Sequence, residues 1–118
     1  MSEGRFSYSG IDQLLHVPAR LSIVTALYAN PKGLTFVELR ALCELSDGNL
    51  SRHLQKLEAE AVVSVEKDFV DRLPRTTVAM TATGRERFER YVDQLRVIVD
   101  RDAAAPAPAS KRAPLRGS

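Results

Sequence analysis

The most constraining feature of this sequence is a short break between two helical patterns. The first pattern starts at Thr35 and ends near Glu44, and the second starts directly after Ser46. Apolar residues recur every three or four positions in both: Phe36, Leu39 and Leu42 in the first, and Leu50, Leu54 and Leu57 in the second. Two helices joined by so few residues have the spacing that is typical of a helix-turn-helix.

Each of these helices begins with a residue suited to capping its first turn. Thr35 stands three residues before Glu38, which is the spacing of a capping box. Ser46 precedes the other helix as a good N-cap. Free amides at helix N-termini also attract phosphate, so Thr35 and Ser46 are candidates for phosphate contacts in addition to capping. The pair of helices has the spacing of a helix-turn-helix unit.

The pattern changes from a period of 3.6 to a period of 2 after Glu60. Apolar and polar residues alternate over residues 63–67 and again over residues 76–80, which predicts two strands. Residues 71–74, Asp-Arg-Leu-Pro, are expected to form the turn between them. The helical pair is therefore followed directly by a β-hairpin with a charged tip.

Further helices are predicted on both sides of this unit. Residues 11–29 have a helical pattern, in which Pro18 fits best at an early position of a second segment. Thr81 is expected to cap a last helix that runs to about Asp102. The predicted fold is mainly α with a small β-hairpin, in the order helix, helix, helix, hairpin, helix.

Composition divides the 118 residues into three parts. Residues 11–102 are predicted to form one domain, preceded by a flexible N-terminus at 1–10. Residues 103–118 are rich in proline and alanine, carry three basic residues and no acid, and are expected to be a disordered tail. The first 102 residues carry 14 basic and 15 acidic side chains, so binding to nucleic acid must be argued from local placement.

The polar side of the helix after Ser46 has the residue types that read DNA. It carries Asn49, Ser51, Arg52, His53 and Lys56. Arginine reads guanine and asparagine reads adenine through paired hydrogen bonds, whereas lysine and hydroxyl groups suit phosphates. The alternative is the solvated face of an ordinary amphipathic helix. The short turn before this helix and the hairpin after it favour DNA recognition.

The hairpin adds candidate contacts to the DNA backbone or an adjacent minor groove. These are Lys67, Arg72, Arg75 and Thr76. Five basic and five acidic residues balance between positions 49 and 77, so the acids must point away from the DNA. Glu58 and Glu60, near the end of the third helix, are expected to do so. An ordinary solvated turn remains the alternative for the tip.

The last helix is the candidate for a dimer interface. Its apolar stripe, with two leucines of the first segment as companions, consists of Phe88, Tyr91, Val92, Leu95, Ile98, Val99, Leu14 and Leu15. A helix of about twenty residues outreaches a domain of this size, so its far end is expected to pack on a second subunit. Packing within its own domain is the alternative.

Other kinds of chemistry have little support. Two histidines, one cysteine and no glycine-rich loop give no recognisable spacing for a metal site, a cofactor site or a catalytic cluster, so an enzyme is not expected. Cys43 is either a redox sensor or, more simply, a small buried hydrophobe. The lone cysteine and the lack of a signal peptide or an apolar run long enough to span a membrane predict a cytoplasmic protein.

Several segments, in order, resemble bacterial and archaeal winged-helix regulators related to the MarR and ArsR families. Residues 46–58 resemble the recognition helix. Residues 75–77 and 81–85 resemble the return of the wing and the start of the last helix, and His16 with Arg20-Leu21 resembles the first helix. The similarity covers about residues 11 to 100. Ala61 departs from it, because a glycine is common there.

The resemblance implies a winged helix-turn-helix with a C-terminal dimerisation helix. It implies a homodimeric transcriptional regulator that binds double-stranded DNA, with the third helix in the major groove and the wing on the backbone or minor groove. A protein-interaction module on the same scaffold, without direct DNA readout, is the alternative. A small-molecule effector between the subunits is a further option that no motif marks.

Overall fold

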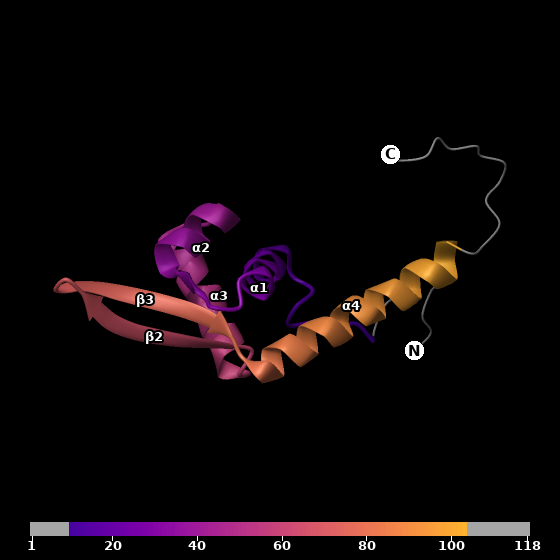
Figure 1. The fold of residues 1–118 in the computed structure, drawn as a ribbon. Coiled ribbons are helices and arrows are strands. Elements are labelled where there is room, and N and C mark those ends of the chain that lie inside the picture. The colour runs from indigo at the N-terminus through magenta and orange to yellow at the C-terminus, as the bar shows by residue number, and fades with distance from the viewer. Residues whose placement is uncertain (1–9, 104–118) are drawn as a thin grey trace, which may run out of the picture.

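The computed structural model describes the backbone of residues 10–103 and the side chains of residues 10–101. These residues form four helices and a three-stranded sheet (Figure 1). The elements in chain order are α1 (Pro18–Ala29), β1 (Leu34–Thr35), α2 (Phe36–Cys43), α3 (Asp47–Ala59), β2 (Val63–Val70), β3 (Leu73–Met80) and α4 (Ala82–Ala103). The predicted fold class is confirmed. The predicted flexible N-terminus falls almost entirely outside the described residues, and the predicted tail does so beyond Ala103.

The starts of α2 and α3 lie where the sequence places them. The Thr35 hydroxyl oxygen accepts a hydrogen bond from the Glu38 amide at 3.1 Å, and the Glu38 carboxylate accepts one from the Thr35 amide at 2.9 Å. The Ser46 hydroxyl oxygen accepts from the Asn49 amide at 3.1 Å. Pro18 is the first residue of α1, where its missing N–H costs nothing. Residues 11–17 form turns rather than a helix, which corrects the first half of that predicted segment.

The sheet has one more strand than the sequence predicts. Its order is β1-β3-β2, all antiparallel, and β1 pairs through Leu34 with Val78 and through Thr35 with Thr77. The hairpin turn is also shorter than expected. Val70 pairs with Leu73, so Pro74 lies within β3 instead of in the turn. Its missing N–H is tolerable because this outer stretch of β3 has β2 as its only partner strand in the described sheet.

The core lies where α1, α2 and α3 meet the sheet and the first turns of α4. Its buried members are Ile11, Leu15, Ile23, Val24, Leu27, Leu39, Leu50, Leu54, Leu57, Val62, Val63, Val78, Phe88 and Tyr91. The three leucines of α3 face inward, so the opposite side of that helix is left to solvent. Among residues 10–103, no helix is both long and apolar enough to cross a membrane.

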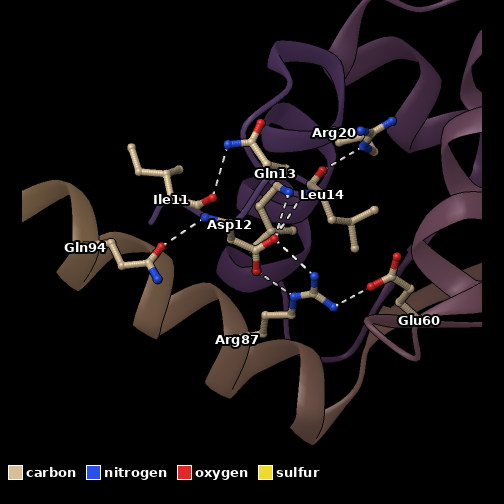
Figure 2. A network of polar contacts seen from close by, with 9 residues as sticks. Ile11, Asp12, Gln13, Leu14, Arg20, Glu60, Arg87 and Gln94 are labelled. Carbon is tan, nitrogen blue, oxygen red and sulfur yellow. Dashed lines mark hydrogen bonds and ion pairs between the residues drawn. The ribbon is translucent and has the colours of Figure 1, made fainter. Parts of the chain in front are cut away.

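A polar network joins α4 to the segment before α1 and to the end of α3 (Figure 2). The Arg87 guanidinium donates to Asp12 at 2.6 and 3.0 Å and to Glu60 at 2.9 Å. The Asp12 carboxylate also accepts from the Leu14 amide, and the Asp12 amide donates to Gln94 at 3.1 Å. The hairpin and α4 leave the helical core in opposite directions (Figure 1).

The network predicts how stability depends on pH. Burial, the largest single influence, raises the pKa of Asp12, but the hydrogen bond and charge of Arg87 and two backbone amides outweigh it and lower the pKa below 3.8. The contribution of this carboxylate to stability is therefore present above pH 3.8 and lost as the pH falls through the lower native pKa. Asp12→Asn should lower the free energy of unfolding at pH 7, and the gap to wild type should close below about pH 3.8 in urea titrations.

Asp93→Asn is the matched control for this measurement. The Asp93 side chain is 73% exposed, and its Oδ1 lies 3.8 Å from Arg96 Nη1. Such a pair contributes little, so the stability of this variant should track wild type across the same pH range. If the difference in free energy of unfolding between wild type and Asp12→Asn stays constant from pH 7 to pH 2.5, the ionised Asp12 carboxylate does not stabilise the fold.

Candidate nucleic-acid interface

One side of α3 is fully open to solvent. Asn49, Ser51, Arg52 and Lys56 are all exposed there, together with Gln55. None of these side chains is buried by residues 10–101, although Ser51 and Gln55 border a groove beside the hairpin. The open polar face of α3 is therefore available to a large ligand.

Arg52 and Asn49 are joined on this face. The Arg52 Nη2 donates to Asn49 Oδ1 at 2.7 Å, one helical turn away. The bond holds the guanidinium against the first turn of α3 and leaves its remaining N–H groups free for other acceptors. Arg52 and Asn49, the residue types that can pair with guanine and adenine, therefore lie side by side on the first turns of α3.

The connection between α2 and α3 is fixed by an ion pair as well as by the caps. Arg40 Nη1 lies 2.6 Å from Asp47 Oδ1. The hydroxyl oxygens of Thr35 and Ser46 are engaged as caps, so a phosphate at either helix start would meet backbone amides first. These contacts set the angle at which α3 is presented.

His53 lies at the rim of the core instead of on the open face. Its side chain is half-buried, and its Nδ1 lies 3.5 Å from Arg20 Nη1. Burial lowers the pKa of His53, and the charges of Arg20, Arg52 and Lys56 lower it further. The ring is therefore neutral at pH 7, and its contribution to an anion-binding surface is smaller than that of its neighbours.

The register of the hairpin separates its charges onto two faces. Directly paired residues of antiparallel strands point to the same side, so Val65, Lys67, Thr76 and Val78 share one face, and Glu66, Asp68 and Arg75 share the other. The first face borders a groove of about 600 Å³ together with α3, lined by Phe36, Ser51, Leu54, Gln55, Glu58, Val65, Lys67 and Thr76. Lys67 and Thr76 are thus brought beside the open face of α3.

The other two hairpin candidates are placed differently. Arg75 lies on the far face and pairs with Asp68 at 3.4 Å, so the structure does not bring it together with Lys67 and Thr76. Arg72 is at the tip, with a φ of 69°, next to Asp71 with a φ of 54°. Two left-handed residues in succession are the signature of a tight two-residue hairpin turn.

The acids only partly avoid the groove. Glu60 turns away to Arg87, as expected. Glu58 lines the groove between α3 and the hairpin, contrary to the expectation that it points away. Glu58 and Lys67 line the same groove, so the acid reduces the positive potential there.

The predicted dimer residues fall into two groups. Leu15, Phe88 and Tyr91 are buried in the core of the domain itself and have no surface left to offer a second subunit. The others keep some exposure: Leu14, Val92, Leu95 and Ile98 are half-buried, and Val99 is 60% exposed. Val97, which the apolar stripe omits, is 64% exposed. The far end of α4 therefore carries apolar surface that its own domain does not cover.

Other chemistry is not apparent in the described part of the chain. Residues 10–101 contain no group of three or more histidine, cysteine or acidic side chains that could hold a metal ion. Cys43 is half-buried, and burial raises the pKa of its thiol, which keeps it in the less reactive protonated form. His16 is used within the fold, with its Nδ1 2.8 Å from the Tyr91 hydroxyl.

Comparison with known proteins agrees with this geometry. A sequence model of the family described as "winged helix DNA-binding domain" matches residues 19–99. The chain is 34% identical over 79 residues to an uncharacterized protein of Methanocaldococcus jannaschii, covering 64% of this chain and 82% of that protein.

Solved structures show the same architecture. A transcriptional regulator homologue from Pyrococcus horikoshii superposes with a TM-score of 0.71 at 31% identity, covering 75% of this chain and 87% of that one. A MarR-family transcriptional regulator from Silicibacter pomeroyi superposes with a TM-score of 0.60 at 27% identity, covering 81% of this chain and 63% of that one.

Proposed function

The chain belongs to the family of winged helix DNA-binding domains, and from this premise we propose that it is a homodimeric, sequence-specific transcriptional regulator. The observation that carries the proposal is the open polar face of α3, flanked by a hairpin face whose only charged side chain is Lys67. In this proposal α3 enters the major groove, which is wide enough for a helix. The hairpin, as the wing, follows the adjacent backbone.

Each side chain of the interface has a role set by its chemistry. Arg52 and Asn49 read base edges, since both present paired hydrogen-bonding groups at the start of α3. Ser51, Lys56, Lys67 and Thr76 hold phosphates and set the register without reading sequence. Arg75 must exchange Asp68 for phosphate to take part, so it contributes less.

The tip residue Arg72 gives a test of the wing contact. Arg72→Gly removes one cation from a position with a left-handed φ, which glycine adopts freely. The free energy of unfolding should therefore change by less than about 1 kcal/mol. The slope of log affinity against log salt should become shallower by about 1, the value of one lost phosphate contact. Fluorescence anisotropy with duplex DNA over a salt series measures this slope.

Asp71→Gly is the matched control for Arg72→Gly. It makes the same change of backbone freedom at the other left-handed position and removes an acid instead of a cation. Its salt slope should equal that of wild type. An unchanged slope in Arg72→Gly would place the tip away from the DNA backbone.

The dimer is proposed to form through the far end of α4. Val97 and Val99 are mostly exposed there, and Val92, Leu95 and Ile98 are half-buried along the same helix. A helix of 22 residues is about 33 Å long, which exceeds what a domain of this size can cover. A second α4 packed alongside would bury these side chains and present two copies of α3 to successive turns of DNA. Sedimentation equilibrium measures the oligomeric state.

The alternative is a winged helix that binds a protein and does not read DNA. The observation that favours it is Glu58, whose carboxylate lies in the groove where a phosphate strand would run. Selection of bound sequences from a random duplex library separates the two functions. The proposed function expects an enriched two-fold symmetric motif and an affinity that falls steeply with salt. Absence of enrichment, together with weak binding that ignores sequence, favours the alternative.

A further inference from the structure

The tip of the hairpin carries large apolar side chains that the rest of the fold does not use. Phe69 is 72% exposed, Leu73 is 68% exposed and Val70 is 38% exposed. None of them belongs to the hydrophobic core or packs against it. An exposed phenylalanine at the most distant point of a domain adds nothing to folding, because its burial supplies no hydrophobic free energy. Its presence needs another explanation.

The register places these side chains on both faces of the tip. Phe69 pairs with Pro74, and Val70 pairs with Leu73 on the opposite face. The end of the hairpin is therefore apolar on both sides and closed by the two-residue turn of Asp71 and Arg72. A flat protein surface would cover only one of these faces. A narrow slot with walls on both sides covers both.

The surrounding charges favour a slot in DNA. On the face that carries Phe69, from Val63 to Met80 along the two strands, the only charged side chain is Lys67. This same face borders α3 across the groove, so Phe69 continues the surface that holds Lys67 and Thr76. Glu66 and Asp68 lie on the other face, where Arg75 pairs with Asp68. Along this face of the wing a polyanion approaching α3 thus meets one cation and apolar surface, and the acid that lines the same groove, Glu58, belongs to α3.

The length of the hairpin matches this position. β2 continues five residues beyond Val65, which borders the groove beside α3. Five residues span about 17 Å at roughly 3.4 Å per residue. The major groove is about 12 Å wide, so a hairpin that leaves a helix centred in it reaches past one phosphate strand. The tip then arrives at the adjacent minor groove.

With the wing of the proposed function reaching the adjacent minor groove, we propose that Phe69 acts as an apolar wedge that unstacks one base step and bends the duplex. The proposal rests on the proposed function and adds a residue to it. Apolar side chains presented to the minor groove unstack base steps and kink DNA towards the major groove. Because pyrimidine–purine steps unstack most easily, the wedge gives the protein a preference at positions that α3 does not touch.

The test uses a 40-base-pair duplex selected by the wild-type protein from a random library, with dyes at its two ends. The same duplex is also made with 2-aminopurine at successive steps outside the motif read by α3. Wild type should bring the dyes closer together and raise 2-aminopurine fluorescence severalfold at one step in each half-site. Phe69→Ala should abolish both signals and lower affinity about tenfold. Phe69→Leu, which keeps an apolar wedge, should restore part of the bend.

Leu42→Ala is the matched control. Leu42 is 62% exposed and lies on α2 beside Pro18 and Leu21, away from the hairpin. This variant should bend and bind the duplex as wild type does. Because both residues are exposed, circular dichroism and thermal unfolding should be the same for the two alanine variants and wild type.

The remaining outcomes each overturn the wedge. A Phe69→Ala protein that binds and bends the duplex as wild type does removes the wedge and leaves the proposed function intact. Specific binding by wild type without any 2-aminopurine signal has the same meaning. A change in sedimentation of the DNA-free protein on Phe69→Ala assigns the tip to a protein contact instead. If wild type enriches no sequence, the proposed function itself fails.

Discussion

Gly84→Ala is expected to cost far more stability than the same substitution at Gly10 or Gly48. Gly84 is buried in the first turns of α4, where the helix crosses the end of the loop before β2. A Cβ there would clash with the Val62 carbonyl oxygen and lie 2.8 Å from the Val62 carbonyl carbon. Both are backbone atoms, so no rotamer change relieves the contact. The start of α4 and the edge of the sheet would have to separate.

The expected loss is about 3 kcal/mol in the free energy of unfolding, the upper part of the range for overpacking. For a domain of this size, that lowers Tm by on the order of 10 °C or more. Thermal unfolding followed by circular dichroism measures it. The crossing also includes a hydrogen bond from the Thr81 amide to the Val62 carbonyl at 3.0 Å, which the added methyl group would strain.

Gly48→Ala is the matched control within the same chain. Gly48 lies in the first turn of α3, and a Cβ there meets nothing within 4 Å. Alanine should leave stability unchanged or raise it by up to about 1 kcal/mol, because it restricts the unfolded chain and favours the helix. Equal stability of the two alanine variants would falsify the assignment of a backbone contact to Gly84.

Arg52→Ala is expected to have the largest effect on DNA recognition. If Arg52 reads guanine through two hydrogen bonds, its loss costs about 1–3 kcal/mol, which is a five- to 150-fold weaker affinity for the selected duplex. The affinity for a scrambled duplex should fall much less, because only one charge is lost. The ratio of the two affinities, measured at a fixed salt concentration, should therefore collapse towards that of non-specific binding.

Arg52→Lys separates base reading from charge. Lysine keeps the cation but lacks the planar fork, and it cannot reproduce the pair of parallel bonds or the geometry of the bond to Asn49. Its affinity for scrambled DNA should match wild type while discrimination is reduced. If Arg52→Ala weakens binding to both duplexes by the same factor, the residue contacts phosphate and Asn49 is left as the reader.

The helices and the hairpin could be predicted because their signals are local. Thr35 with Glu38, Ser46, and the leucines of α3 each act within one or two turns, and the structure has them as expected. β1 could not be predicted in the same way. It consists of Leu34 and Thr35 alone, and it becomes a strand only by pairing with β3 more than forty positions later. A strand of two residues is too short to show the alternation of apolar and polar side chains that identifies a strand in a sequence.

Ala61 departs from similar regulators at a position with a left-handed backbone. The alanine stands where similar regulators commonly have glycine, and its φ of 60° gives the reason. The loop between α3 and β2 needs a left-handed residue there, which glycine adopts without strain. The chain tolerates alanine, and the Ala61 amide still donates to the Glu58 carbonyl at 2.9 Å.

The candidate site was only partly visible in the sequence. The polar face of α3 follows from helical spacing. The direct pairing of Lys67 with Thr76 and of Asp68 with Arg75 depends on the hairpin register, which differs by two residues from the one that a turn over residues 71–74 gives. Phe69 lies beyond the strand that the alternation predicts over residues 63–67, and its exposure follows only from the extension of β2 to Val70. Asp12 and Arg87 are 75 residues apart, and no pattern links them.

That last contact has a consequence for the spacing of target sites. One guanidinium fastens both the end of α3 and the segment before α1 to α4. In the proposed dimer, the angle between each α3 and the two-fold axis is then fixed by a few side chains, and no hinge lies between α3 and α4. A rigid dimer of this kind binds only DNA whose two half-sites have one fixed separation. Operators with base pairs inserted or removed between the half-sites should therefore bind much more weakly.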